Sequence, residues 1–191
     1  LELRLAEIPG RGASAGQPLP PSLVDFAAAA ATEIAGWEAR PIVLYGHSMG
    51  GLVAYEAVLR LPTDRKPEKL VVSACRSPGS RHEIPADLSD EALLRTANLY
   101  GSLTHELSSK EVQAYFLSQL RVDLNLLREY EPTRQPVSVP LLVLGGEDDP
   151  VVLAAELEGW RLYTQKGFEL RLSPGGHFFP FEKPAIFDHI F

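Results

Sequence analysis

Apolar runs and helix-like segments alternate along this chain. Leu1, Leu3, Leu5 and Ile8 nearly alternate with polar residues, which predicts an opening strand that ends at Pro9. Further strands are predicted at four apolar runs: 41–45, 70–72, 139–144 and 168–172. The runs at 41–45 and 139–144 are continuous, as in strands that are buried on both faces. Helices are predicted between and after the strands: 22–35, 52–61, 152–164 and 184–191. This alternation implies an α/β fold, with a mostly parallel sheet flanked by helices on both faces.

One segment, from about residue 82 to 131, interrupts the alternation because it contains no strand pattern. Ser89 to Tyr100 is predicted to be a helix that stops at Gly101, and Ser108 with Glu111 forms a capping box before a long second helix. We therefore expect a helical insertion between two strands of the sheet. It provides either additional core or a lid over a functional site.

Composition and charge narrow the possible classes of protein. With 191 residues, of which 45% are apolar, the chain is expected to form a single domain, 1–191. The net charge of -7 argues against nucleic-acid binding, and the apolar run 26–31 is too short to span a membrane. The chain opens without a signal-peptide pattern, and its one cysteine, Cys75, excludes an internal disulfide framework. We expect a cytoplasmic monomer that binds no metal.

Two serines lie in a Gly-x-Ser-x-Gly pattern, and only Ser48 has the surroundings of a nucleophile. A buried strand runs into Ser48 and a helix leaves it, as in the turn that exposes a serine hydroxyl at the carboxyl edge of a sheet. Gly46 and Gly50 are expected to relieve crowding there, where strand and helix pass close together. Ser14 is followed by a proline-rich stretch instead, so 12–16 is predicted to be a surface loop.

A nucleophilic serine needs a base and an acid, and the chain supplies both after Ser48. His177 follows the last predicted strand in a glycine-containing loop, whereas the other four histidines lie in less suitable places. Asp149 follows the buried run 139–144 and is the preferred acid, with Asp148 as the alternative. Met49, the first residue after the serine, offers its backbone N–H to a developing oxyanion.

Several segments outside these residues resemble the type II, or editing, thioesterases of polyketide and nonribosomal peptide synthases, which are α/β-hydrolases. They are Pro-Gly-Arg-Gly at 9–12, GHSMGGLVAYE at 46–56, SACRSPG at 73–79, LRVDLNLLREYEP at 120–132, GGEDDP at 145–150 and GGHFF at 175–179. The resemblance covers essentially the whole chain. It implies an antibiotic-biosynthesis enzyme that uses no cofactor of its own and hydrolyses acyl thioesters on the phosphopantetheine arm of an acyl or peptidyl carrier protein. In this interpretation 82–131 is the lid.

The chain departs from that family at its ends. Family members usually begin with another strand and a loop whose backbone supplies the second oxyanion donor, so we expect the domain to be clipped at both ends. A medium-chain fatty acyl-carrier thioesterase, a carboxylesterase and an inactive relative that serves as a binding module remain alternatives. For the carrier-docking surface, Arg121 and Arg128 are candidates, although solvated helix charges of this kind are common.

Overall fold

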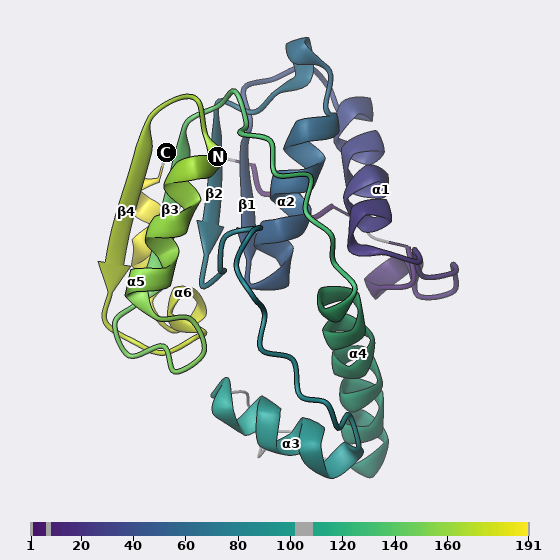
Figure 1. The fold of residues 1–191 in the computed structure, drawn as a ribbon. Helices are drawn as coiled ribbons and strands as arrows, with labels where there is room; N and C mark the ends of the chain where they lie inside the picture. The colour runs from purple at the N-terminus through teal and green to yellow at the C-terminus, as the bar shows by residue number, and fades with distance from the viewer. Residues whose placement is uncertain (1, 7–8, 102–108, 191) are drawn as a thin grey trace.

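The computed structural model describes residues 2–6, 9–101 and 109–190, and its centre is a four-stranded sheet. The strands are β1 (Val43–His47), β2 (Lys69–Ser73), β3 (Leu141–Gly146) and β4 (Phe168–Ser173). They lie in the order β1-β2-β3-β4, and each neighbouring pair is parallel. All four carboxyl ends therefore lie at one edge of the sheet, which faces downward in Figure 1.

The two faces of the sheet carry different helices. Leu70 and Val72 of β2 belong to a core shared with α1 (Leu23–Gly36), α2 (Met49–Arg60), α5 (Ala154–Leu157) and the 3-10 helix η4 (Glu158–Tyr163). Val71, between them, belongs to a second core with α6 (Phe179–Glu182) and the 3-10 helix η5 (Pro184–His189). Because successive side chains of a strand point to opposite faces, the unbroken apolar runs place helices on both sides. The predicted α/β architecture is confirmed.

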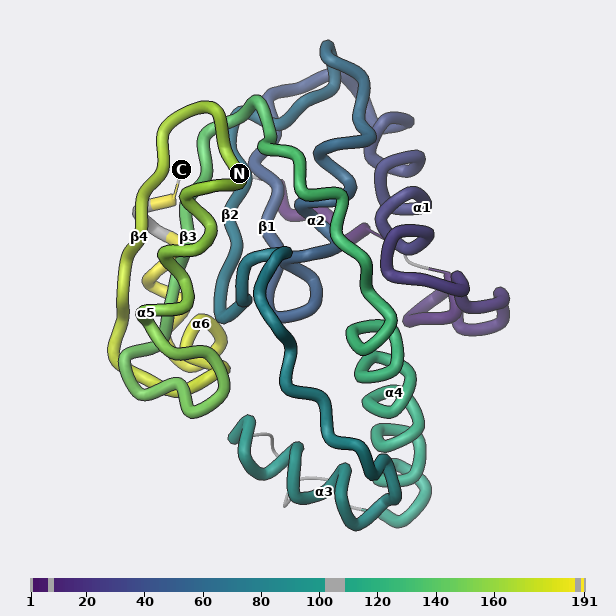
Figure 2. The backbone as a smooth tube through the Cα atoms, viewed as in Figure 1, coloured from purple at the N-terminus to yellow at the C-terminus, as the bar shows by residue number. Residues whose placement is uncertain are grey.

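The predicted insertion consists of α3 (Asp90–Leu99) and α4 (Lys110–Arg128). Leu93, Leu117 and Leu124 form a small core of their own between these helices. In Figure 1, α3 and α4 lie beyond the carboxyl ends of the strands. Figure 2 shows the two connections, one from the end of β2 to α3 and one from α4 back past α2 to β3. The insertion is thus packed as a unit next to the edge where the predicted site residues gather.

The predicted opening strand is wrong. Residues 2–6 adopt no strand, and the side chains of Leu3 and Leu5 are 85% and 78% exposed. A segment of alternating apolar and polar residues forms a strand only where another strand shares its backbone hydrogen bonds. Among the described residues β1 pairs with β2 alone, so residues 2–6 have no strand beside them. For the same reason β1, predicted to be buried on both faces, is only partly buried along most of its length. By contrast, every residue of β3 is buried, as predicted.

Most helix boundaries agree with the prediction, and three segments differ. The predicted helix 152–164 is one turn of α-helix followed by 3-10 helix, and the predicted helix 184–191 is 3-10 helix over the described residues. The cap of α4 is Ser109, whose hydroxyl accepts the Val112 N–H, while the predicted cap Ser108 lies outside the described residues. Two short 3-10 turns, η1 (Gly12–Ser14) and η2 (Thr63–Arg65), complete the fold. Ser14, at the end of η1, is partly buried, and no strand precedes it among the described residues.

Candidate active site

Ser48 lies in a sharp turn between β1 and α2. Its backbone has φ 51° and ψ −128°, a strained conformation for a residue with a side chain, and its N–H donates to the Ser73 carbonyl. A Cβ on Gly46 would lie 2.2 Å from the Gly50 carbonyl oxygen, so strand and helix can cross this closely only at glycine. The predicted role of Gly50 is different in the structure: a Cβ there would meet nothing within 4 Å, and Gly51, against Cys75, is the second crowded position.

The structure brings the three predicted site residues into one hydrogen-bonded chain. His177 Nε2 lies 3.0 Å from Ser48 Oγ, and His177 Nδ1 lies 2.9 Å from Asp149 Oδ2. The His177 side chain is 3% exposed, and that of Asp149 is fully buried. One ring nitrogen therefore faces the serine hydroxyl while the other is held by a carboxylate, which is the arrangement in which a histidine can accept the serine proton.

Asp149, and not Asp148, is the carboxylate that contacts His177. Its Oδ1 accepts the N–H groups of Val151 and Val152 at 2.8 and 3.1 Å, which leaves Oδ2 for the histidine. Burial by itself raises the pKa of Asp149, but the hydrogen bond and charge of His177 and the two backbone N–H groups together lower it below the usual value. The side chain of Asp148 is exposed. Asp149 therefore remains ionised and can orient His177 and stabilise its charged form.

Two backbone features deliver His177 to this position. Gly175 has φ +129°, a conformation that favours glycine, and it turns the chain after β4 back towards the sheet edge. A Cβ on Gly146 would lie 2.5 Å from the carbonyl oxygens of Gly175 and Gly176. The loop that carries the acid and the loop that carries the histidine thus touch, backbone against backbone, at a glycine.

Met49, the predicted oxyanion donor, is the first residue of α2. Its N–H has no preceding helical turn to accept it, and it lies at the positive end of the helix dipole beside Ser48. This position suits a donor to an oxyanion that forms on the serine side of the site.

A second hydrogen-bonded group beside the site was not predicted. His47 Nδ1 lies 2.8 Å from Ser73 Oγ, which also lies 2.7 Å from the Tyr45 hydroxyl. Burial, together with the nearby His177, lowers the pKa of His47 to about 4, so His47 is neutral at neutral pH. His47 and His177 are 5.2 Å apart between ring centroids. No sequence motif marks this group, because it depends on the parallel register that pairs His47 with Ser73.

The cavity at Ser48 is small, about 50 Å³. It is bounded by Ser48, Met49 and His177, by Arg76 and His82 from the connection after β2, and by Tyr100 from the end of α3. The Tyr100 ring stacks on the His177 ring at 5.0 Å between centroids and 27° between planes. Arg76 donates from Nε to Glu156 at 2.8 Å, which fixes this side of the cavity to α5. The insertion thus contributes a wall of the site, and no sequence pattern indicated which of its residues would do so.

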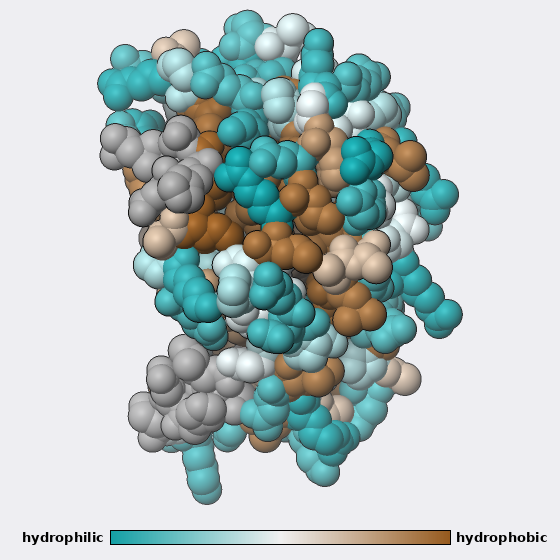
Figure 3. Space-filling model, turned by 90° about the vertical axis from the view of Figure 1, so that its left-hand side faces the viewer, coloured by the Kyte–Doolittle hydropathy of each residue, from teal (hydrophilic) through white to brown (hydrophobic). Residues whose placement is uncertain are grey.

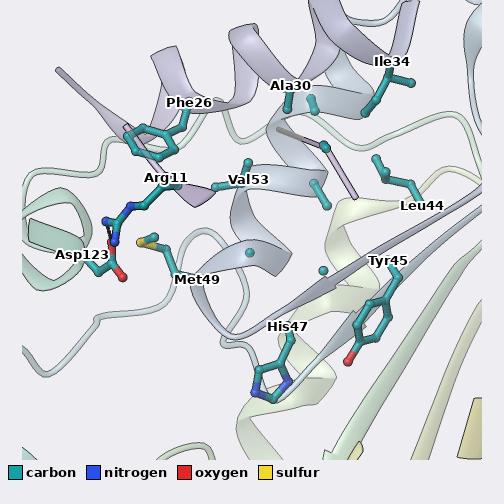
Figure 4. A pocket seen from close by; sticks show the side chains of 15 residues that line it. Arg11, Phe26, Ala30, Ile34, Leu44, Tyr45, His47, Met49, Val53 and Asp123 are labelled. Carbon is teal, nitrogen blue, oxygen red and sulfur yellow. Dashed lines mark hydrogen bonds and ion pairs between the residues drawn. The ribbon is translucent and has the colours of Figure 1, made fainter. Parts of the chain in front are cut away.

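A larger cavity of about 380 Å³ lies on the other side of Met49, between α1, α2 and β1. Figure 4 shows its mostly apolar lining, with Phe26 and Val53 above Met49, and with Arg11 reaching Asp123 of α4 at one end. Arg11 is paired with both Asp123 and Gln119. Burial raises the pKa of Asp123 to about 6, although the Arg11 charge acts in the opposite direction. Met49 therefore separates the site from a cavity that reaches the insertion.

The described residues provide no group of three or more side chains of the types that bind a metal ion. Within the same part of the chain, no helix is long and apolar enough to cross a membrane. Cys75 is buried, which raises the pKa of its thiol to about 12.

Comparison with known proteins gives the family. The family described as thioesterase domain matches residues 1–191. A probable cadicidin biosynthesis thioesterase of Streptomyces griseus is 32% identical over 177 residues, which are 91% of this chain and 49% of that protein. The chain thus spans about half the length of this curated relative.

Two solved structures are also similar. RedJ, a thioesterase from the prodiginine pathway of Streptomyces coelicolor, is 31% identical with a TM-score of 0.80, over 91% of this chain and 70% of RedJ. YbtT, a type II thioesterase from the yersiniabactin NRPS/PKS pathway, is 27% identical with a TM-score of 0.84, over 96% of this chain and 78% of YbtT. The chain belongs to the thioesterase domain family and has the α/β-hydrolase fold of the type II thioesterases.

Proposed function

We propose that this protein hydrolyses acyl thioesters carried on the phosphopantetheine arm of a carrier protein, and that it thereby removes aberrant acyl groups from a biosynthetic synthase. The observation that carries the proposal is the chain from Ser48 Oγ through His177 to Asp149, at 3.0 and 2.9 Å, on a strained turn at the carboxyl edge of the sheet. The names of the similar proteins support the thioester as the bond that is cleaved.

In the proposed reaction, His177 takes the proton of Ser48 and the serine oxygen attacks the thioester carbonyl. The Met49 N–H donates to the oxyanion of the tetrahedral intermediate. Collapse of the intermediate expels the carrier thiol, which receives the proton from His177. Water, deprotonated by the same histidine, then attacks the acyl-serine and releases the free acid. Asp149 stays ionised throughout and stabilises the imidazolium.

Docking of a carrier protein by overall charge is unfavourable if the carrier is acidic, because this chain has a net charge of -7. The two candidate arginines also have partners within the insertion. Arg121 donates to the Leu88 carbonyl and to Asp90, and Arg128 donates to Asn125 and to the Pro85 carbonyl. Both guanidinium groups therefore hold the connection to α3 against α4, and we propose that docking uses other side chains.

The test is a panel of acyl groups loaded on a carrier protein, with oxygen esters of the same acyl groups beside it. We expect release of free acid from the carrier, with a higher kcat/KM than for the oxygen esters. Ser48→Ala, which keeps the fold but lacks the nucleophile, is expected to lower kcat on the order of 10⁵ to 10⁶-fold. Faster turnover of oxygen esters than of every acyl-carrier would identify a carboxylesterase instead. A protein without turnover whose Ser48 fails to react with a fluorophosphonate would be a non-catalytic relative.

A further inference from the structure

Tyr100 brings the insertion into contact with the ring of the catalytic base. The residue follows α3 directly, and its ring lies nearly parallel to that of His177, 5.0 Å away. Tyr100 and His177 both line the cavity that contains Ser48. An acyl group that occupies this cavity must therefore fit beside the tyrosine ring or displace it.

The position of Tyr100 is fixed by the helix before it. Its backbone N–H donates to the Thr96 carbonyl at 3.1 Å, so the residue continues the last turn of α3. Gly101, with φ +72°, then turns the chain away. Leu93 of α3 packs with Leu117 and Leu124 of α4, and this contact holds α3 in place beyond the carboxyl ends of the strands (Figure 1). The ring is thus positioned by a packed helix pair.

The volume of the cavity is far below that of an acyl pocket. A cavity of about 150 Å³ takes up one benzene molecule, so about 50 Å³ leaves room for an acyl group of roughly two carbon atoms. Pockets that bind larger molecules have volumes of about 300 to 1,000 Å³. Other lining residues come from the sheet edge, at Met49, 74–76 and 151–152, and from the insertion, at His82, Ile84 and Leu127. Among these side chains of the insertion, Tyr100 is the one whose ring stacks on His177, so its removal enlarges the cavity beside His177 without changing the sheet edge.

We propose that Tyr100 determines which acyl groups Ser48 accepts. Acyl groups of about two carbon atoms react while Tyr100 stays stacked on His177, and longer or branched groups react only when the ring is displaced. This inference rests on the proposed hydrolysis of acyl thioesters at Ser48. It makes Tyr100 a specificity-determining residue, supplied by the insertion and absent from the hydrogen-bonded chain of Ser48, His177 and Asp149.

The test compares Tyr100→Ala with Tyr100→Phe, which keeps the ring, and with Tyr115→Ala, which removes a tyrosine that is 57% exposed on α4. For each protein, kcat/KM is measured with acetyl, butyryl and octanoyl groups on the same carrier protein. Tyr100→Ala is expected to raise the octanoyl-to-acetyl ratio about tenfold or more. Tyr100→Phe and Tyr115→Ala are expected to leave the ratio within about twofold of wild type. A purely structural role of Tyr100 would lower kcat/KM for all three groups by one common factor, and that result would overturn the inference.

A second measurement separates this inference from the proposed function. Fluorophosphonates with a methyl or an octyl chain phosphonylate the serine and expel fluoride, so their labelling rates report access to Ser48 without a thioester. Tyr100→Ala is expected to raise the octyl-to-methyl rate ratio, and Tyr100→Trp, which fills more of the cavity, to lower it. Such changes in labelling without hydrolysis of any acyl-carrier would contradict the proposed function alone. Unchanged ratios in both variants would overturn the role of Tyr100.

Discussion

Single glycines decide how closely the catalytic segments approach one another. At Gly146 the loop of the acid touches the loop of the histidine, and a Cβ would lie 2.5 Å from two carbonyl oxygens. Gly50, which belongs to the same serine motif, has free space where a Cβ would be. Two glycines near one site therefore differ in whether a methyl group can be added, and this difference can be measured.

Gly146→Ala is expected to push the Asp149 and His177 loops apart. We expect kcat/KM to fall about 100-fold, as for a displacement of about 1 Å in a catalytic group, and the free energy of unfolding to fall by about 1 to 3 kcal/mol. Gly50→Ala is the matched control, and because alanine favours the helix, its stability is expected to equal or exceed that of wild type by up to about 1 kcal/mol. Thermal unfolding and ester hydrolysis of both variants provide the check. Equal losses in the two variants would contradict this account.

At this scale the sequence was most informative about residues whose role depends on chain order. Ser48, Asp149 and His177 each follow a predicted strand, and parallel strands bring their carboxyl ends together. The choice between Asp148 and Asp149 depends on the direction in which the backbone turns after β3, and the sequence pattern does not determine that direction. No sequence pattern identified Tyr100 as a site residue, because its position depends on how α3 packs on α4.

Among the elements, α2 connects the nucleophile to the insertion through a buried carboxylate. Glu56 is fully buried and accepts hydrogen bonds from Arg60, from the Tyr130 hydroxyl, and from both the N–H and the hydroxyl of Thr133. Tyr130 and Thr133 lie just after α4. The helix that follows Ser48 therefore also holds the returning end of the insertion, and Figure 2 shows this connection passing α2.

Glu56→Gln is expected to weaken this connection by about 3 kcal/mol in the free energy of unfolding, because it leaves part of a buried charge network without partners. Burial alone raises the pKa of Glu56, but its hydrogen bonds lower it below the usual value. Its stabilising contribution is therefore complete above the unfolded-state pKa and is lost as the pH falls through the lower, folded-state pKa. Urea unfolding between pH 3 and 7 should show this acid-side loss in wild type and less of it in Glu56→Gln. The exposed Glu68→Gln serves as control, and a Glu56→Gln curve parallel to that of wild type would refute the assignment.

A strand could be predicted from its apolar pattern where other predicted strands of this chain pair with it. The unbroken run 139–144 became a buried central strand because β2 and β4 flank it. The alternating run at the start did not become a strand, since no described segment pairs with it. The helix after β3 became mostly 3-10 helix around Trp160, whose indole N–H donates to the Cys75 carbonyl. Such a tertiary bond has no counterpart in local periodicity.

For the whole molecule, the strand order matches the chain order, so Ser48 and His177 follow strands at opposite edges of the described sheet. The two edges are covered differently. α2 packs against β1 and α1 against α2, whereas β4 has a half-exposed pattern and Leu172 is 45% exposed. Figure 3 views the molecule from the side where β4 lies, and apolar side chains reach the surface in the middle of that face.

Because thinly covered segments open at lower free energy than buried ones, β4 and the loop to His177 are expected to open before α1 and α2 unfold. In a urea titration, hydrolysis should therefore decline at a lower concentration than far-UV ellipticity, and amide exchange should be faster in β4 than in β3. Coincident midpoints for activity and ellipticity would contradict this order.

Because β4 is only partly covered, the proposed activity is expected to be lost before the fold is. A preparation that has been stored or heated is then expected to keep its helical spectrum while His177 no longer lies within reach of Ser48. For this chain, an assay of the proposed hydrolysis is therefore a more sensitive measure of an intact site than far-UV ellipticity. Burying the exposed side chains of β4 is the first change to make if the activity is to last longer.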